Sequence, residues 1–152
     1  MSPITQRYSD GTGLSWPGST PADDNVDFIR MASDADFTKT MGVQLIQGRD
    51  IDINTYASDS TAVLLNQTAL KTMRLKDPIG QTIRDNDIDW HIVGVMKDFI
   101  FESPFEKIDK LVVYGPNAWF NVMHVKLNPA KSVTEDLAIT EQVFKEYKLV
   151  LR

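Results

Sequence analysis

Residues 61–73 read TAVLLNQTALKTM and predict a buried strand that runs directly into a helix. The run from Thr61 to Leu65 is almost entirely apolar and has the length of a strand, which suits a strand covered on both faces. Asn66 is a typical N-cap residue. A helix that begins there places Ala69, Leu70 and Met73 on one side, so this part of the chain is expected to form a βα unit.

Toward the C-terminus, the pattern predicts more strands and one long helix. Residues 81–84 and 90–96 flank the polar tip Asp85-Asn86-Asp87, as in a β-hairpin. Residues 111–114 and 122–127 are expected to be two further strands. The last helix begins at Ser132 or Thr134, and an apolar stripe at helical spacing marks one amphipathic face. The stripe consists of Val133, Leu137, Thr140, Phe144 and Tyr147.

Toward the N-terminus, the pattern is less regular. Residues 26–31 are expected to form a strand, and a short helix with Asp34 as its N-cap is expected to end at Gly42. Residues 43–46 form a brief extended piece. Residues 1–25 are rich in Ser, Thr, Gly, Pro and Asp and are expected to be a loop that Leu14 and Trp16 anchor.

These elements predict an α+β fold: a mixed β-sheet with short βα units and a β-hairpin, arranged in one or two lobes. The predicted organisation is a loop-rich N-terminal segment, residues 1–25, followed by a core domain, residues 26–152. A strand that feeds a helix usually leads to a further strand, yet the sequence ends soon after the last helix. We therefore expect the chain to be an excised piece of a larger protein.

Composition restricts the function. The 152 residues are 42% hydrophobic and 24% charged, with a net charge of -5, which suits one ordinary globular domain. An acidic chain is a poor partner for nucleic acid, because phosphate binding depends on Lys and Arg. There is no cysteine, so thiolate chemistry and cysteine-held metal sites are excluded. The sequence contains no apolar run of transmembrane length and no apolar core of a secretory signal at Met1–Arg7.

Motifs that carry chemistry are weak. Asp85, Asp87 and Asp89 have the first spacings of a calcium loop, but the glycine and glutamate that the loop requires are replaced by Trp90 and Met96. A solvated hairpin tip is the simpler interpretation. No phosphate-binding glycine loop and no Gly-x-Ser-x-Gly elbow occur.

The two histidines, His91 and His124, both fall on predicted strands without metal-ligand spacing. Solvent exposure is the simpler interpretation for His124, which shares a strand face with Lys126. Glu102 and Glu106 form an acid pair that we expect to lie in an exposed loop. No catalytic, cofactor-binding or metal-binding residue is assigned.

The aromatic residues give one candidate contact site. Trp90 alternates with Ile92 along the hairpin and is expected in the core. Trp119 and Phe120 follow a loop sequence, and exposed loop aromatics are typical interface anchors, so these two residues are candidate partner contacts. The alternative is that they fold under the loop and close the core.

Four blocks of sequence, in this order and spacing, resemble the extracytoplasmic core domain of MacB/FtsX-like ABC-transporter permeases. The blocks are DFTKTMGVQLIQGRD (36–50), DSTAVLLNQTA (59–69), LKDPIGQTI (75–83) and IVGVMKDFIFES (92–103). The last block is similar in wording to the branch common in Bacteroidetes. Ile51 stands where this family often has Phe, and Ile100 where His is common.

The resemblance implies a non-catalytic domain without a cofactor, on the extracytoplasmic (periplasmic) face of the inner membrane, as part of an integral membrane protein. ATP would be hydrolysed by a separate ATP-binding subunit or domain, and the full permease would be a homodimer with a periplasmic or outer-membrane partner protein. The domain would couple ATP-driven motion to export or to that partner. Two alternatives remain: a free-standing soluble module that binds a small ligand, and a hydrolase whose catalytic triad has no recognisable motif.

Overall fold

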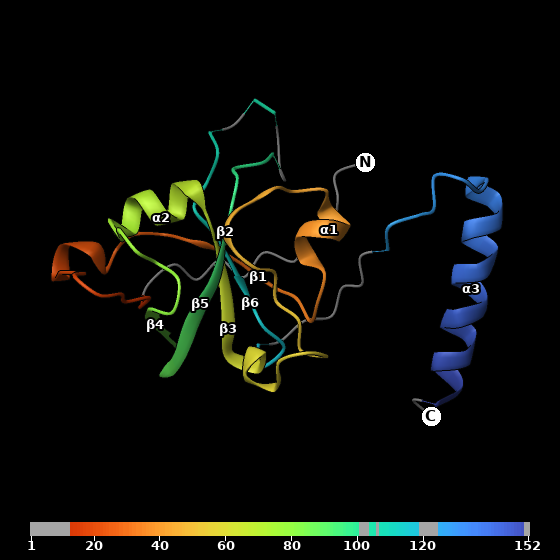
Figure 1. Ribbon diagram of the computed structural model, residues 1–152, viewed down its shortest axis with the longest axis horizontal. Helices are drawn as coiled ribbons and strands as arrows, with labels where there is room; N and C mark the ends of the chain where they lie inside the picture. Colours follow the sequence, from red (N-terminus) through yellow and green to blue (C-terminus); the bar gives the residue numbers. More distant parts are fainter. Residues whose placement is uncertain (1–12, 101–103, 106, 119–124, 151–152) are drawn as a thin grey trace.

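The structure is a computed structural model, which describes residues 13–100, 104–105, 107–118 and 125–150. A six-stranded sheet forms its centre (Figure 1). The strands are β1 (Ile29–Ala32), β2 (Leu45–Gly48), β3 (Ala62–Asn66), β4 (Thr82–Asp85), β5 (Ile88–Met96) and β6 (Leu111–Tyr114). Their order is β1-β6-β3-β5-β2, and β4 also pairs with β5.

The sheet is mixed, as predicted. β1 pairs with β6 and β3 with β5 in parallel, whereas the pairs β3–β6, β2–β5 and β4–β5 are antiparallel. The helices are α1 (Phe37–Met41), α2 (Gln67–Met73) and α3 (Val133–Val150), with short 3-10 helices η1 (Pro21–Asp23) and η2 (Ala57–Thr61). The fold is therefore α+β.

Hydrophobic side chains pack on both faces of the sheet. One cluster joins α2 and the segment before η1 to the sheet, and the other joins α1 and Ile51 to the opposite face. The first contains Leu14, Trp16, Phe28, Val63, Leu65, Ala69, Met73, Ile83, Trp90, Ile92, Val112 and Tyr114. The second contains Ile29, Met31, Phe37, Ile51, Ala62, Leu64, Val93, Met96, Leu111 and Val113. Because both faces are covered, every residue of the central strand β3 is buried, which confirms the prediction for this strand.

Asn66 connects three elements. Its Oδ1 accepts the Ala69 backbone N–H at 2.9 Å, which caps α2 as predicted. The same oxygen accepts the Leu111 N–H at 3.0 Å, and the side-chain amide donates to the Asp109 carbonyl at 2.8 Å. The cap therefore also fixes the start of β6.

The hairpin is present, with one correction. Asn86 and Asp87 both have positive φ angles, 50° and 62°, as a two-residue turn of type I′ requires. Asp85, predicted to be part of the solvated tip, lies instead in β4 and is buried. Alternation along β4 points its side chain to the same face as Ile83, into the first hydrophobic cluster.

The N-terminal region differs from the prediction in two details. β1 begins at Ile29, later than predicted. Asp34 does not cap α1: its carboxylate accepts the neighbouring Ala35 N–H, and Asp36, in the left-handed conformation, takes the N-cap position without a side-chain cap. Gly42 ends α1 with a φ of 69°, as predicted.

The segment before η1 is anchored to the sheet, as predicted, by Leu14 and Trp16, which are buried in the first hydrophobic cluster. Ser15 adds a backbone bridge to Arg84, and an ion pair of 2.7 Å between Asp23 Oδ2 and Arg74 Nη2 joins η1 to α2.

The C-terminal part contains the predicted long helix. Ser132 and Glu135 form reciprocal bonds at its start: the Ser132 N–H donates to Glu135 Oε2 at 3.0 Å, and the Glu135 N–H donates to Ser132 Oγ at 3.3 Å. Figure 1 shows α3 standing apart from the sheet. The strand predicted at 122–127 is wrong for residues 125–127, which have no strand structure, and residues 122–124 lie outside the described part. Among the described residues, no helix combines the length and apolar character needed to cross a membrane.

Candidate functional site

Two clusters of charged side chains lie at the same end of the sheet. At this end β1 and β6 finish, β3 and β5 begin, and the β4–β5 hairpin turns. His91 and Trp90 are neighbours on β5, so their side chains point to opposite faces. The Arg49 cluster (Arg49, Asp59 and His91) therefore lies on one face, and the Arg30 cluster (Arg30, Asp85 and Tyr114) on the other.

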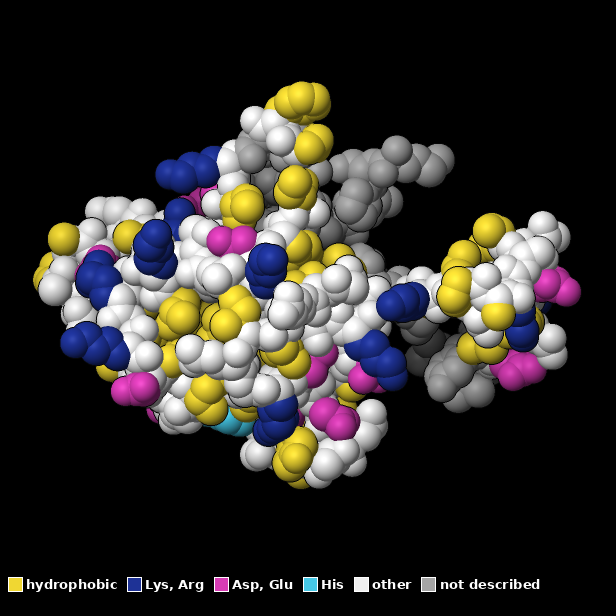
Figure 2. Space-filling view, turned by 45° about the horizontal axis from the view of Figure 1, so that its top comes forward, with side chains coloured by type: hydrophobic (Ala, Val, Ile, Leu, Met, Phe, Trp, Pro, Cys, Tyr) yellow, Lys and Arg dark blue, Asp and Glu magenta, His cyan; other side chains and the backbone are white. Residues whose placement is uncertain are grey.

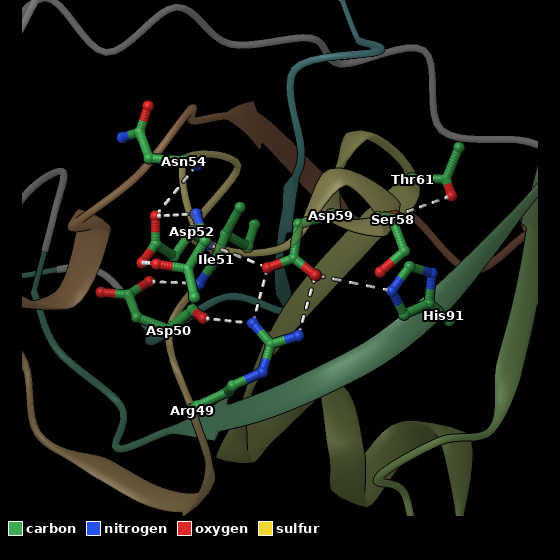
Figure 3. A network of polar contacts seen from close by, with 10 residues as sticks. Arg49, Asp50, Ile51, Asp52, Asn54, Ser58, Asp59, Thr61 and His91 are labelled. Atoms are coloured by element: carbon green, nitrogen blue, oxygen red, sulfur yellow. Dashed lines mark hydrogen bonds and ion pairs between the residues drawn. The ribbon is translucent and has the colours of Figure 1, made fainter.

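The Arg49 cluster is centred on a fully buried carboxylate (Figure 3). Arg49 donates two hydrogen bonds to Asp59, from Nη1 to Oδ2 at 2.6 Å and from Nη2 to Oδ1 at 2.8 Å. The Asp52 backbone N–H donates to Asp59 Oδ2 at 2.9 Å. The guanidinium also lies 3.8 Å from the centre of the Tyr56 ring.

These contacts fix the charge on both partners. Burial by itself would raise the pKa of Asp59, but the hydrogen bonds from Arg49 and the Asp52 N–H and the Arg49 charge outweigh it, and the pKa is lowered. The hydrogen bond from Asp59 raises the pKa of Arg49, against a smaller opposing effect of burial. The pair is therefore ionised over the whole neutral range.

The Arg49 cluster joins the chain after β2 to the chain before β3. The backbones approach closely here: a Cβ added to Gly94 would lie 2.2 Å from the Arg49 carbonyl oxygen, so a side chain at this position would displace the strand. The groups that donate hydrogen bonds to the Asp59 oxygens, the Arg49 guanidinium and the Asp52 N–H, both belong to the segment between β2 and β3. We conclude that the cluster is part of the architecture.

The Arg49 cluster does not form a catalytic triad. Ser58 lies near the His91 ring in Figure 3, but His91 Nε2 and Asp59 Oδ1 are 3.8 Å apart, which is too long for the hydrogen bond that would orient the base. Asp59 is already occupied by Arg49. His124, the second histidine, lies outside the described residues.

The Arg30 cluster is a second buried network. Arg30 Nε donates to Asp85 Oδ2 at 2.7 Å and Nη2 donates to Oδ1 at 3.2 Å, while the Tyr114 hydroxyl donates to Oδ2 at 2.5 Å. Burial and the neighbouring Asp85 raise the pKa of Tyr114 well above its ordinary value, so the phenol stays neutral. Arg30 and Asp85 thus neutralise one another within the protein.

A cavity of about 410 Å³ adjoins the Arg30 cluster. It lies between the ends of β1 and β6 and the β4–β5 hairpin, and most of its exposed wall is apolar. Its lining is Arg30, Met31, Ala32, Asp85, Asn86, Ile88, Trp90, Tyr114, Asn117 and Ala118. Trp90 packs edge-on against Tyr114, with 4.6 Å between ring centres. The buried Nε1 of Trp90 has no hydrogen-bond partner among the described residues.

The structure separates the three acidic residues of the calcium interpretation. Asp85 is buried against Arg30, whereas the side chains of Asp87 and Asp89 are 98% and 63% exposed and lie beside Arg84. Within the described ranges, no group of His, Asp and Glu could hold a metal ion.

The outcome for the predicted site residues is mixed. Trp90 lies in the core, as predicted. Trp119 and Phe120, the predicted partner contacts, lie outside the described residues, as do Glu102 and Glu106. Sequence reasoning did not find the Arg30–Asp85 pair, whose members are 55 residues apart. The available signal was an arginine between the apolar Ile29 and Met31 of a predicted strand.

The fold is similar to the folds of two solved permease domains. The periplasmic region of MacB from Actinobacillus actinomycetemcomitans superposes with a TM-score of 0.62, at 14% identity, over 93% of this chain and 64% of that one. A domain of a putative permease from Porphyromonas gingivalis gives a TM-score of 0.57, at 19% identity, over 93% and 68%. This chain thus spans less than two thirds of the MacB periplasmic region.

The chain belongs to the family of MacB-like periplasmic core domains, whose sequence model matches residues 3–142. This confirms the resemblance seen in the four sequence blocks; the closer likeness to the Bacteroidetes branch stays a prediction. None of the curated proteins matches the chain.

Proposed function

We propose that this chain is the non-catalytic extracytoplasmic domain of an ABC-transporter permease. In this proposal it couples ATP-driven motion on the cytoplasmic side to export, or to a partner protein outside the membrane. Membership of the MacB-like periplasmic core domains supports the general placement. The observation that carries the coupling role is the uncovered apolar face of α3.

The apolar face of α3 is exposed in the described structure (Figure 2). Three large side chains of this face, Val133, Leu137 and Phe144, are between 48% and 62% exposed. Beside the face, Ile139 and Val143 are 48% and 45% exposed. An amphipathic helix gains most of its stability from packing this face against another surface. We infer that the face is covered in the assembled permease.

The six-stranded sheet, together with its two hydrophobic clusters, is suited to move as one unit. Hydrophobic clusters cover both of its faces, the Arg30 cluster joins β1, β4 and β6, and the Arg49 cluster fastens the segment between β2 and β3. A body of this kind moves rigidly, because packed cores do not deform continuously. Force applied to any part of the sheet would therefore displace all of it.

The remaining parts of the proposal follow from the resemblance. Residues 26–152 would be the core domain and residues 1–25 its leading segment, at the periplasmic face of the inner membrane. An ATP-binding subunit would act through the membrane part, the full permease would be a homodimer, and Trp119 and Phe120 would contact a periplasmic or outer-membrane partner.

The test uses the complete permease with its ATP-binding subunit in nanodiscs. Because this chain has no cysteine, Gln142→Cys on the polar face of α3 provides a spin-label site free of background from this domain. We expect the distance between the two labels of the homodimer to change between the nucleotide-free and ATP-bound states. Identical distance distributions would overturn coupling, and the absence of a dipolar signal would overturn the homodimer.

A matched pair of variants tests α3 itself. Leu137→Glu places a charge on the apolar face, whereas Thr134→Glu places the same charge on the polar face of the same helix. We expect Leu137→Glu alone to abolish the nucleotide-dependent change in distance. Equal behaviour of the two variants would show that the apolar face has no role.

The second candidate function is the free-standing module that binds a small ligand. The cavity beside the Arg30 cluster is the observation that favours it. A ligand site and membership of a permease are compatible.

A further inference from the structure

We propose that β2 and the groove beside it bind an extended segment of a partner protein, which adds to the sheet as a further strand. On one face this segment carries an acidic residue between two apolar residues. The inference goes beyond the coupling role and does not depend on it, because it concerns only residues of this chain.

The outer edge of β2 is open. β4 and β2 follow one another along the same side of β5 and form one edge of the sheet. Beside β4 the chain itself supplies a further extended segment, because Ser15 forms a backbone bridge with Arg84. No described strand or bridge covers the outer side of β2, and Ile46, Gln47 and Gly48 are exposed. This edge therefore offers backbone groups to which an added strand can bind.

β2 lacks the side chains that usually protect an open edge. Such strands commonly carry charged residues or proline, whereas β2 reads Leu-Ile-Gln-Gly. The strand at the opposite edge, β1, is buried from Ile29 to Met31. β2 is short and contains a bulge between Leu45 and Gln47, so backbone pairing alone extends over few residues. Side-chain contacts must therefore supply the selectivity.

The groove beside β2 provides these contacts. It measures about 610 Å³ and lies between β2 and α2. Its lining includes Ile46 from β2, buried Val95 from β5, and Leu70 and Leu75 from α2 and the turn after it. Every second side chain of an added strand points to the face of the sheet that α2 covers. Apolar residues at these positions of the segment would contact the apolar part of the groove.

One unpaired cation specifies the acidic residue of the segment. Arg74, which also lines the groove, is paired with Asp23. Both oxygens of Asp98 accept hydrogen bonds from Thr68, at 3.0 and 2.8 Å. Lys71 is exposed and takes part in no ion pair within the described part of the chain. A second copy that paired β2 with β2 would leave this charge unpaired, because β2 itself contains no acidic residue.

The experiment follows the amide signals of the ¹⁵N-labelled chain by NMR during titration with the peptide acetyl-Thr-Val-Thr-Glu-Thr-Val-Thr-amide. This sequence places both valines and the glutamate on one face of a strand and reads the same in both directions. We expect saturable shifts in β2 and α2 and slower hydrogen exchange in β2, while the β1 signals stay in place. A peptide with Gln in place of Glu should bind about two- to five-fold more weakly, as the loss of one exposed ion pair predicts.

Two N-methylated forms of the peptide test the addition of a strand. Successive N–H groups of a strand point to opposite edges, so methyl groups on the Val and Glu nitrogens block one edge and methyl groups on the Thr nitrogens block the other. Only one edge of the peptide can face β2. We expect one methylated form to lose binding and the other to keep it, and binding of both forms would overturn the proposal.

Two matched pairs of variants identify the site. Lys71→Glu should reverse the preference, so that the chain binds the peptide with Lys in place of Glu more tightly than the original. Lys76→Glu makes the same change at an exposed residue outside the groove and should keep the original preference. Ile46→Lys places a charge on the open edge and should abolish binding, whereas Val125→Lys, at another exposed apolar residue, should leave it unchanged.

The proposal is overturned if the original peptide causes no saturable shift in β2 at millimolar concentration, or if Lys71→Glu keeps the preference for the acidic peptide. It is equally overturned if the chain forms dimers that Ile46→Lys disperses, because the edge then belongs to a second copy. None of these results would bear on the nucleotide-dependent distances that test coupling.

Discussion

Replacing Arg49 with methionine removes the charged partner of a fully buried carboxylate and keeps a side chain of similar length. Asp59 then has only the Asp52 N–H as a strong partner. A buried carboxylate that loses its counter-charge is strongly destabilising, because its desolvation is no longer compensated. We therefore expect Arg49→Met to be among the most harmful single changes near the surface of this domain.

The magnitude follows from the geometry. Arg49 donates two short bonds to Asp59, and bonds between charged groups contribute about 1.5–3 kcal/mol each. The Arg49 side chain is 37% exposed, so solvent screening favours the lower end of this range. We expect a loss of about 3 kcal/mol in the free energy of unfolding, which lowers Tm by roughly 6–12 °C for a domain of this size.

The assay is urea unfolding of the isolated chain, followed by the fluorescence of its tryptophans. Arg84→Met is the matched control, since the ion pairs of Arg84 with Asp87 and Asp89 are exposed and should contribute at most about 1 kcal/mol. A double-mutant cycle with Asp59→Asn isolates the pair, and we expect a coupling energy of about 2 kcal/mol or more.

The reasoning is refuted if Arg49→Met destabilises the chain no more than Arg84→Met, with the urea dependence unchanged. A coupling energy near zero would also refute it, because Arg49 would then act through Tyr56 or the Asp50 carbonyl and not through Asp59.

Two further predictions concern the pH dependence of stability through Asp59 and the contribution of the Asn66 cap of α2. The pKa of Asp59 is lowered in the folded state, so its contribution is complete above its unfolded pKa of about 3.9 and is lost as the pH falls through the folded value. The stability difference between wild type and Asp59→Asn should therefore shrink as the pH falls below about 4 in urea titrations; a difference that grows over this range would contradict the lowered pKa. Asn66→Ala removes the α2 cap and leaves the Leu111 N–H and the Asp109 carbonyl unpaired, so we expect a loss of about 3 kcal/mol in the same assay. A loss below about 1 kcal/mol would show that the Asn66 bonds are replaced by water.

The sequence was most informative where structure depends on near neighbours. The apolar run of β3, the Asn66 cap and the end of α1 at Gly42 each follow from a few consecutive residues. The hairpin was also predictable, because only Asn86 and Asp87 have to adopt the left-handed turn. The four motif blocks in turn identified the family.

The candidate site was much harder to predict. The Arg30 cluster joins β1, β4 and β6, and no local pattern indicates which strands become neighbours in a mixed sheet. Asp85 illustrates the difficulty: its polar neighbours predict a solvated tip, but alternation along β4 directs it into the core, where Arg30 compensates the burial. The amphipathic stripe of α3 was visible in the sequence, whereas its lack of cover in the described structure was not.

For this protein, the sequence alone determined the identity of most elements and the α+β class, because periodicity, capping and turn chemistry act over a few residues. The family followed from the resemblance of the four motif blocks. Only the tertiary structure decided the order β1-β6-β3-β5-β2, the pairing of Arg49 with Asp59 and of Arg30 with Asp85, and the cavity beside Trp90. These features depend on which distant segments pack together, and that choice is made by the burial of both sheet faces as a whole.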